Sequence, residues 1–223
     1  MSHTVHPFSH RLGIIRDWKS RWFALHAKYR DNLKADVLLR EYLAKRLKGM
    51  HVGGLEIERG EKTLRIVVKT ARPGLIIGRS GEGSVKLRGD ILTFLKKKKI
   101  PVSQELKLDI EEIKSPEANA AIVTEMIIEG LEKRMPFRRV MKQMIEKVMA
   151  SREVEGVKIY LGGRLGGADM ARSETLKKGR IPLQTLRADI DFAIGRASIP
   201  QGDLGIKVWI YKGEVFKKSA LQK

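Results

Sequence analysis

A short glycine-flanked loop, Gly78-Arg79-Ser80-Gly81, has the residue types and spacing to hold a phosphate. Glycine at both ends permits backbone angles and a close approach that a Cβ atom would block. Apolar residues recur at helical spacing directly after the loop, at Leu87, Ile91 and Leu95. The loop therefore opens a helix, whose free N–H groups point outward at the positive end of the helix dipole. The alternative is an ordinary tight turn between two helices, because 21 glycines make chance matches common.

Three cations in the second half of the chain, Arg138, Arg139 and Lys142, form a second candidate binding surface. At the helical spacing of about 100° per residue, they fall within one arc of roughly a quarter turn or a little more. An apolar stripe runs mostly on another side of the same helix: Val140, Met141, Met144, Ile145, Val148 and Met149. The grouped charges fit either a solvated helix face or a surface that grips passing phosphates.

The overall charge indicates a polyanionic partner. The 223 residues carry a net charge of +19, and the pI is about 10.2. So large an excess repels itself unless a partner neutralises it, which favours nucleic acid over an acidic membrane surface. A hydrophobic content of 42% is enough for packed cores, and the length fits one large domain or two small ones.

The sequence offers little for enzyme chemistry. Without cysteine, disulfides and thiolate metal sites are excluded. The closely spaced His3, His6 and His10 lack nearby carboxylates, which argues against a metal site. Asp189 and Asp191 alternate on one predicted strand and are interpreted as polar partners rather than as a metal pair. No Gly-x-x-x-x-Gly-Lys-Ser/Thr motif is present, so we expect no nucleotide hydrolysis, no cofactor and no metal.

Targeting and membrane signals are also missing from the sequence. No apolar run of the signal-peptide type stands at the N-terminus, and no stretch approaches the length of a membrane span. We therefore expect no membrane partner. A structural RNA-binding protein is the leading hypothesis. An RNA-dependent enzyme and a free regulator of messenger RNA or transcription are the alternatives, and sedimentation would separate a regulator, which is mostly free, from a component of a large RNA–protein particle.

The first third of the chain predicts a basic extension followed by an α+β domain. Residues 1–31 mix cations with Trp18, Trp22 and Phe23, which either stack on RNA or cover the edge of a core, the favoured role for the rings. A helix capped by Asp31 or Asn32 follows, with an apolar stripe at Leu39, Leu43 and Leu47. Strands are predicted at residues 55–58 and 63–70, and a third through Leu106, Leu108 and Ile110.

The order of these elements defines a domain type. Three amphipathic strands with helices on one face form a two-layer α+β domain, which we expect over residues 32–114. The glycine loop lies between two helices after a strand of this sheet. That order resembles the type II KH domain, which clamps a few nucleotides of single strand with its Gly-x-x-Gly loop.

A second α+β domain is predicted over residues 115–212. Ser115 is expected to cap a helix with Pro116 at its first position, and Pro136 opens the helix that carries the basic face. Strands are expected near residues 157–161, 185–192 and 205–211, with a glycine-rich loop at 162–167. Residues 213–223 are interpreted as a short basic tail.

Six motifs in order resemble the bacterial-type family of the third protein of the small ribosomal subunit. They start at Val5-His6-Pro7, Thr70-Ala71-Arg72-Pro73-Gly74, Phe137-Arg138-Arg139, Gly163-Arg164-Leu165-Gly166-Gly167, Leu186-Arg187-Ala188-Asp189 and Gly205-Ile206-Lys207-Val208. The resemblance implies a protein of the subunit head that is bound to small-subunit ribosomal RNA and neighbouring proteins, at the entrance of the messenger RNA channel. It implies a cytoplasmic ribosomal component, neither an enzyme nor a homo-oligomer.

The resemblance also implies roles for individual cations. Arg138, Arg139 and Lys142 would face incoming messenger RNA and assist its passive unwinding. Candidates for contact with ribosomal RNA, besides the glycine loop, are Arg11, Arg16, Lys19, Arg72, Arg164 and Arg172. One departure weakens the loop: the family often has two lysines between its glycines, whereas this chain has Arg79 and Ser80.

Overall fold

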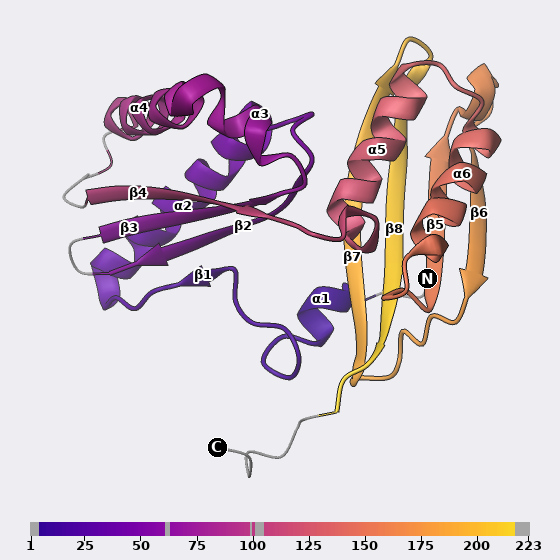
Figure 1. Ribbon diagram of the computed structural model, residues 1–223, viewed down its shortest axis with the longest axis horizontal. Coiled ribbons are helices and arrows are strands. Elements are labelled where there is room, and N and C mark those ends of the chain that lie inside the picture. Colours follow the sequence, from indigo (N-terminus) through magenta and orange to yellow (C-terminus); the bar gives the residue numbers. More distant parts are fainter. Residues whose placement is uncertain (1–4, 61–62, 99, 101–104, 217–223) are drawn as a thin grey trace. The chain divides into compact units, whose positions relative to one another are not determined.

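The computed structural model describes residues 5–60, 63–98, 100 and 105–216 (Figure 1). These residues divide into two compact units. One combines the described residues up to Asp17 with those from Ser115 onward, and the other runs from Trp18 to Lys114. The segment predicted as an extension, residues 1–31, thus divides at Asp17 between the units. His3 and the end of the predicted tail, residues 217–223, lie outside the described residues.

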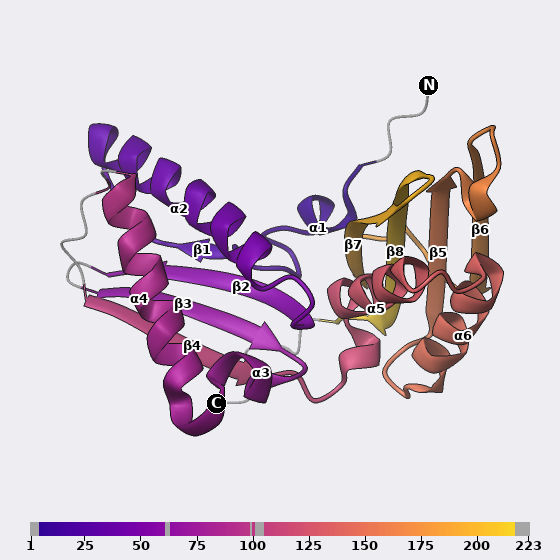
Figure 2. The ribbon, with the colours of Figure 1, turned by 90° about the horizontal axis from the view of Figure 1, so that it is seen from above.

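The unit from Trp18 to Lys114 has the predicted two-layer α+β architecture, but its sheet has four strands rather than the predicted three, because a two-residue strand was not recognised in the sequence. Its sheet has the order β1-β2-β3-β4, in which β2 and β3 are antiparallel while β1 and β4 pair in parallel with β2 and β3. The strands are β1 Ser20–Arg21, β2 Val52–Arg59, β3 Thr63–Thr70 and β4 Glu105–Glu112. Helices α2 (His26–Arg46) and α4 (Glu82–Lys97) cover one face of this sheet, and the short α3 (Pro73–Ile77) precedes α4 (Figure 2).

The core of this domain is built from the predicted stripes. Leu39 and Leu43 of α2 are completely buried against Ile57 of β2, Ile66 of β3 and Ile91 of α4. The helix prediction was wrong about the start of α2, which begins at His26 rather than near Asp31. Its first turns are exposed and have no side-chain cap, so neither an apolar period nor a capping residue marks them in the sequence.

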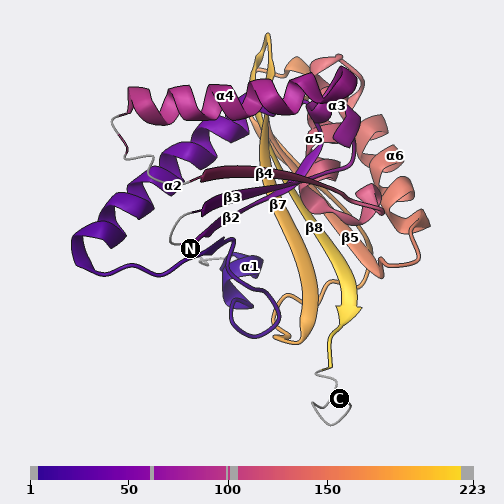
Figure 3. The same cartoon turned by 60° about the vertical axis from the view of Figure 1, so that its left-hand side comes forward.

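The second unit, which comprises the described residues up to Asp17 and from Ser115 onward, is also a two-layer α+β domain. All neighbours in its sheet are antiparallel, in the order β6-β5-β8-β7. The strands are β5 Gly156–Gly163, β6 Arg172–Gly179, β7 Ala188–Ile199 and β8 Gly202–Glu214. Figure 3 shows β7 and β8 side by side as long, curved strands of this sheet. Helices α5 (Ala120–Glu132) and α6 (Phe137–Ala150) pack on its inner face, and the short α1 (Pro7–His10) lies against β7.

Two predictions for this unit need correction. The residue that caps α5 is Asn119, whose Oδ1 accepts from the N–H groups of Ala121 (3.0 Å) and Ile122 (3.3 Å), and not Ser115, which precedes a separate 3₁₀ turn. Strand β6 was not predicted, because its exposed lysines and glycine hide the alternation of an edge strand. The two-domain α+β class itself is confirmed.

Candidate nucleic-acid interface

The glycine loop has the backbone that its sequence requires. Gly78 (φ 71°), Ser80 (φ 53°) and Gly81 (φ 85°) all adopt positive φ, which a non-glycine residue such as Ser80 rarely does. Arg79 and Ser80 are exposed between α3 and α4. Glu82, also exposed, follows directly and places a negative charge beside the same loop. The loop therefore presents one cation, Arg79, to a phosphate, with the carboxylate of Glu82 beside it, while the N–H of Gly78 already donates to the carbonyl of Gly74 (3.0 Å).

A third glycine, which the sequence reasoning missed, holds this loop in shape. A Cβ atom on Gly83 would lie 2.6 Å from the carbonyl oxygen of Ile76 and 2.8 Å from that of Ile77. The first turn of α4 can therefore approach the end of α3 only because residue 83 has no side chain. The Ser84 hydroxyl adds a hydrogen bond of 2.7 Å to the carbonyl of Gly81.

The cations of α6 form the second candidate site, called here the basic face: Arg138, Arg139 and Lys142. All three side chains are exposed, whereas the opposite side of the helix, including Val140 and Met141, is buried in the core. Arg138 donates from Nε to Glu174 of β6 over 3.1 Å, but 65% of its side chain is exposed. An ion pair in such contact with water is weak and can exchange its carboxylate for a phosphate.

Strand β6 extends the basic face. Arg172 places its guanidinium 5.8 Å from the centre of the Phe137 ring at the start of α6. A shallow groove of about 210 Å³ runs between α6 and β6, and Lys142, Lys177 and Lys178 contribute to its walls. The sequence reasoning missed both lysines because it did not predict the strand. Nothing in the sequence indicates that this segment pairs with β5, and only that pairing brings β6 beside α6.

Arg11 is not available to RNA, contrary to the prediction. Its side chain is completely buried, and its guanidinium donates to four carbonyl oxygens: Ala188 (2.6 Å), Leu183 (2.9 Å), Thr185 (2.9 Å) and Pro7 (3.1 Å). Burial lowers the pKa of Arg11, and the charge of Arg16 lowers it further, against the opposite effect of Asp189. Arg11 fastens the N-terminal segment to the chain around residues 183–188.

Some of the other predicted cations bind groups of their own chain, and some are exposed to solvent. Arg16 pairs with Asp189 over 2.6 Å and is only partly exposed. Arg164 donates to the carbonyls of Ala168 (2.9 Å) and Gln201 (3.1 Å), so it mainly organises its own loop. The side chains of three others are exposed and remain candidates for contact with ribosomal RNA: Lys19, Arg72 and Arg172.

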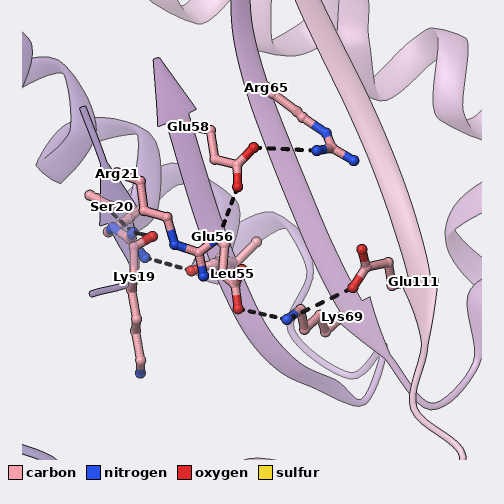
Figure 4. A network of polar contacts seen from close by, with 10 residues as sticks. Lys19, Ser20, Arg21, Leu55, Glu56, Glu58, Arg65, Lys69 and Glu111 are labelled. Carbon is pink, nitrogen blue, oxygen red and sulfur yellow. Dashed lines mark hydrogen bonds and ion pairs between the residues drawn. The ribbon is translucent and has the colours of Figure 1, made fainter. Parts of the chain in front are cut away.

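The open face of the first sheet balances its own cations (Figure 4). Lys69 pairs with Glu56 (2.6 Å) and Glu111 (3.8 Å), while Arg21 and Arg65 both pair with Glu58 (2.9 and 3.3 Å). On this face of the sheet, acidic side chains thus lie directly beside the cations. These cations are therefore largely neutralised by their own sheet, unlike Arg139 and Lys142 of the basic face, for which no ion pair is seen among the described residues.

Arg40 and Trp22 secure the strand that leads into this sheet. Arg40 donates to the carbonyls of Lys19 (2.7 Å) and Leu55 (2.9 Å), which joins β1 to β2, and burial lowers its pKa. The sequence favours packing at a core edge for the rings of residues 1–31; Trp22 is partly buried and donates from Nε1 to buried Asp36 over 2.7 Å. The same prediction was wrong for Trp18 and Phe23, whose exposed fractions are 63% and 85%.

The acidic residues of the second unit serve as polar partners. Asp189 pairs with Arg16, Asp191 accepts from the N–H of Ala120 over 2.8 Å, and Asp169 lies 3.4 Å from Arg164. Among the described residues, no group of three or more His, Asp or Glu side chains is arranged to hold a metal ion. Within the same part of the chain, no helix has both the length and the apolar character needed to cross a membrane.

The sheet order, the helix–glycine loop–helix segment and the exposed basic face define the class of KH-domain proteins with a second α+β domain. Family models agree: a model described as KH domain matches residues 38–118, and one described as ribosomal protein S3, C-terminal domain, matches residues 127–210.

Two relatives, both named small ribosomal subunit protein uS3, show how far the likeness extends. The protein of Endomicrobium trichonymphae is 49% identical over 220 residues, which cover 99% of this chain and 91% of the relative. That of Caldicellulosiruptor saccharolyticus is 45% identical over 215 residues, or 96% and 94% of the two chains. The chain therefore belongs to the uS3 family of small ribosomal subunit proteins, which are structural, non-enzymatic components of the cytoplasmic ribosome.

Proposed function

We propose that this chain binds small-subunit ribosomal RNA in the head of the subunit and lines the entrance of the messenger RNA channel. There the basic face grips incoming messenger RNA and assists its passive unwinding. Neighbouring proteins of the head and of the channel entrance would be its other partners. The observation that carries the proposal is the basic face itself: three exposed cations on a helix whose opposite side is fixed in a packed core.

The geometry supports a grip on phosphates rather than reading of bases. Arg138, Arg139 and Lys142 project from one rigid helix, and Lys177 and Lys178 stand across the groove on β6. Cations so arranged neutralise a passing backbone whatever its sequence, and each contact contributes little by itself. Such a surface restrains the strand while translocation supplies the energy for unwinding, because the chain has no nucleotide-hydrolysis motif.

The test is the combined variant Arg138→Ala, Arg139→Ala and Lys142→Ala. The buried side of α6 is untouched and alanine is the best helix former, so the variant should fold and assemble into subunits. Ribosomes carrying it should slow on a messenger RNA with a stable hairpin at the channel entrance, relative to the same messenger RNA without the hairpin. Equal slowing on both would contradict the proposal.

A matched control removes the same charge elsewhere. Lys28, Arg30 and Lys34 are three exposed cations in the first half of α2, and their replacement by alanine lowers the net charge equally. The control should leave the hairpin effect at its wild-type size. If the control slows hairpin passage as much as the basic-face variant, total charge rather than this surface is responsible.

A further inference from the structure

A half-enclosed pocket of about 350 Å³ opens beside the start of the basic face. Its walls are mainly apolar and come from four segments: the end of α5, the α5–α6 turn, the loop at residues 165–167 and the β7–β8 turn. Its apolar side chains are those of Leu131, Met135, Pro136, Phe137, Ile199 and Leu204, and its polar side chains are those of Arg134 and Gln201. A pocket of this size and character is typical of a site for a small, flat, apolar group.

The loop wall of the pocket is backbone. Gly166 (φ 70°) and Gly167 (φ 81°) are both in the left-handed region, where side chains are disfavoured. A Cβ atom on Gly166 would lie 3.8 Å from the Phe137 ring, and one on Gly167 would lie 3.5 Å from the side chain of Gln201. The absence of these side chains keeps the space in front of the ring open.

Arg164 holds the pocket in this form. Its guanidinium donates to the carbonyl of Ala168 on the loop (2.9 Å) and to that of Gln201 on the β7–β8 turn (3.1 Å), so it ties two walls together. The pocket is therefore preformed rather than created by its occupant. This accounts for an arginine that the sequence suggested as an RNA ligand but that is largely engaged with its own chain.

The rim of the pocket is cationic. The guanidinium groups of Arg138 and Arg172 lie over the Phe137 ring, 5.6 and 5.8 Å from its centre, just outside the lining of the pocket. Arg134 lines the pocket itself, and Arg139 is exposed on the next position of the helix. Carboxylates in the neighbouring segments include Glu174, which pairs with Arg138, the fully exposed Asp169 beside Arg164, and Asp203 at the start of β8, which pairs with Arg196. An apolar, aromatic-lined space with this rim complements a flat ring joined to an anion, which is the chemistry of a nucleotide.

We infer that the pocket receives one unpaired nucleobase of the RNA strand, which stacks on Phe137 while the adjoining phosphates contact Arg138, Arg139 and Arg172. The inference rests on the proposed grip of the basic face on messenger RNA and deepens it: the strand is held by a base as well as by its charges. Every base has a flat face, so the pocket accepts all four with little preference. A base engaged here is unavailable for pairing, which favours the single-stranded form.

The test compares two single-stranded oligoribonucleotides of equal length, one normal and one with consecutive abasic riboses, by fluorescence anisotropy with the full chain. Both carry the same phosphates, so their difference isolates the bases. The wild type should bind the normal strand roughly tenfold more tightly. Phe137→Leu keeps an apolar side chain against the core and should lose most of that ratio, with an unchanged dependence on salt. Phe192→Leu, the same change on β7, should keep it.

The outcomes separate this inference from the proposed function. The variant without Arg138, Arg139 and Lys142 should bind both strands more weakly, with a smaller salt slope and the same ratio between them. A wild-type ratio near one, or loss of the ratio in Phe192→Leu instead of Phe137→Leu, overturns the pocket inference alone. An unchanged salt slope in the basic-face variant overturns the proposed grip. Photocrosslinking of a 4-thiouridine strand to the wild type should label residues 131–137 or 164–167, and labelling confined to other segments also refutes the inference.

Discussion

Replacing Arg11 by methionine tests whether a buried guanidinium fastens the N-terminal segment. Methionine has a similar length and fills the same space without donors. Arg11 donates four hydrogen bonds to carbonyl oxygens, and its side chain is fully buried. The variant leaves those carbonyls without their partner, which destabilises the folded unit.

The size of the effect follows from opposing contributions. Hydrogen bonds from a charged donor contribute about 1.5–3 kcal/mol each, so four would add up to roughly 6–12 kcal/mol. Two effects reduce this sum: methionine avoids the cost of taking a charged guanidinium out of water on folding, and the N-terminal segment can detach so that water reaches the carbonyls. We expect a net loss of about 3 kcal/mol, at the upper end of ordinary substitutions.

Calorimetry of the full chain measures this loss. The transition of the unit that contains Arg11 should move down by roughly 10 °C, and the other unit should melt as before. Hydrogen exchange should rise at residues 183–188, where three of the accepting carbonyls lie. Arg30→Met is the control, because it removes an equal charge from a side chain that is 81% exposed.

The opposite pattern would refute the reasoning. If Arg11 were an RNA ligand, Arg11→Met would melt like Arg30→Met and lower the salt slope of RNA binding by about 0.7 for the lost phosphate contact. Melting points of the two variants within about 2 °C of each other would therefore remove the fastening role. Arg11→Lys should fall between wild type and methionine, because one ammonium cannot reach all four carbonyls.

Three further predictions follow from the two units. Gly83→Ala should destabilise the unit Trp18–Lys114 by about 2 kcal/mol, because its Cβ would meet two carbonyl oxygens of α3. Gly89→Ala, whose Cβ would meet nothing, should stabilise the same unit by roughly 0.5–1 kcal/mol. Denaturant titrations in which both variants shift the unfolding midpoint equally would contradict this. Burial and the charges of Glu155 and Glu214 raise the pKa of Tyr211, so the contribution of its neutral side chain to stability is complete below about pH 10 and declines at higher pH. The difference in unfolding free energy between wild type and Tyr211→Phe should therefore narrow from pH 9 to 11. A difference that stays constant over this range would exclude the effect. Aspartate at both Arg79 and Ser80 should weaken single-strand RNA binding without lowering the melting temperature, and unaltered affinity would mean that the loop does not contact RNA.

Much of the fold could be predicted because the buried face of a helix or strand makes apolar residues recur at a regular spacing in the sequence. The stripes of α2, α4 and α6 and the alternation of β3 mark faces that lie in the cores, and the structure places them there. The exposed elements could not be predicted in this way. Strand β6 and the first turns of α2 face water, so their residues carry no period.

The candidate sites also differ in how far they could be predicted from the sequence. The three cations of the basic face could be grouped from helical spacing alone, because they share one element. Arg11 could not be recognised as a buried residue, since three of its four partners lie about 175 residues away and only the fold brings them together. Composition marks an arginine as basic but does not tell whether its charge meets a phosphate or a carbonyl of its own chain.

The interrupted connectivity of the second unit has a consequence for synthesis. Its first residues, up to Asp17, emerge from the ribosome before the whole of Trp18–Lys114, whereas the remainder follows only from Ser115. The domain in between can fold as soon as it is complete. Arg11, however, must wait until Ala188 has been added, 177 residues later, which takes about 10–35 s at 5–20 residues per second. During that interval the nascent chain exposes a segment that is destined for burial, and a chaperone that shields it would act on the amino terminus first.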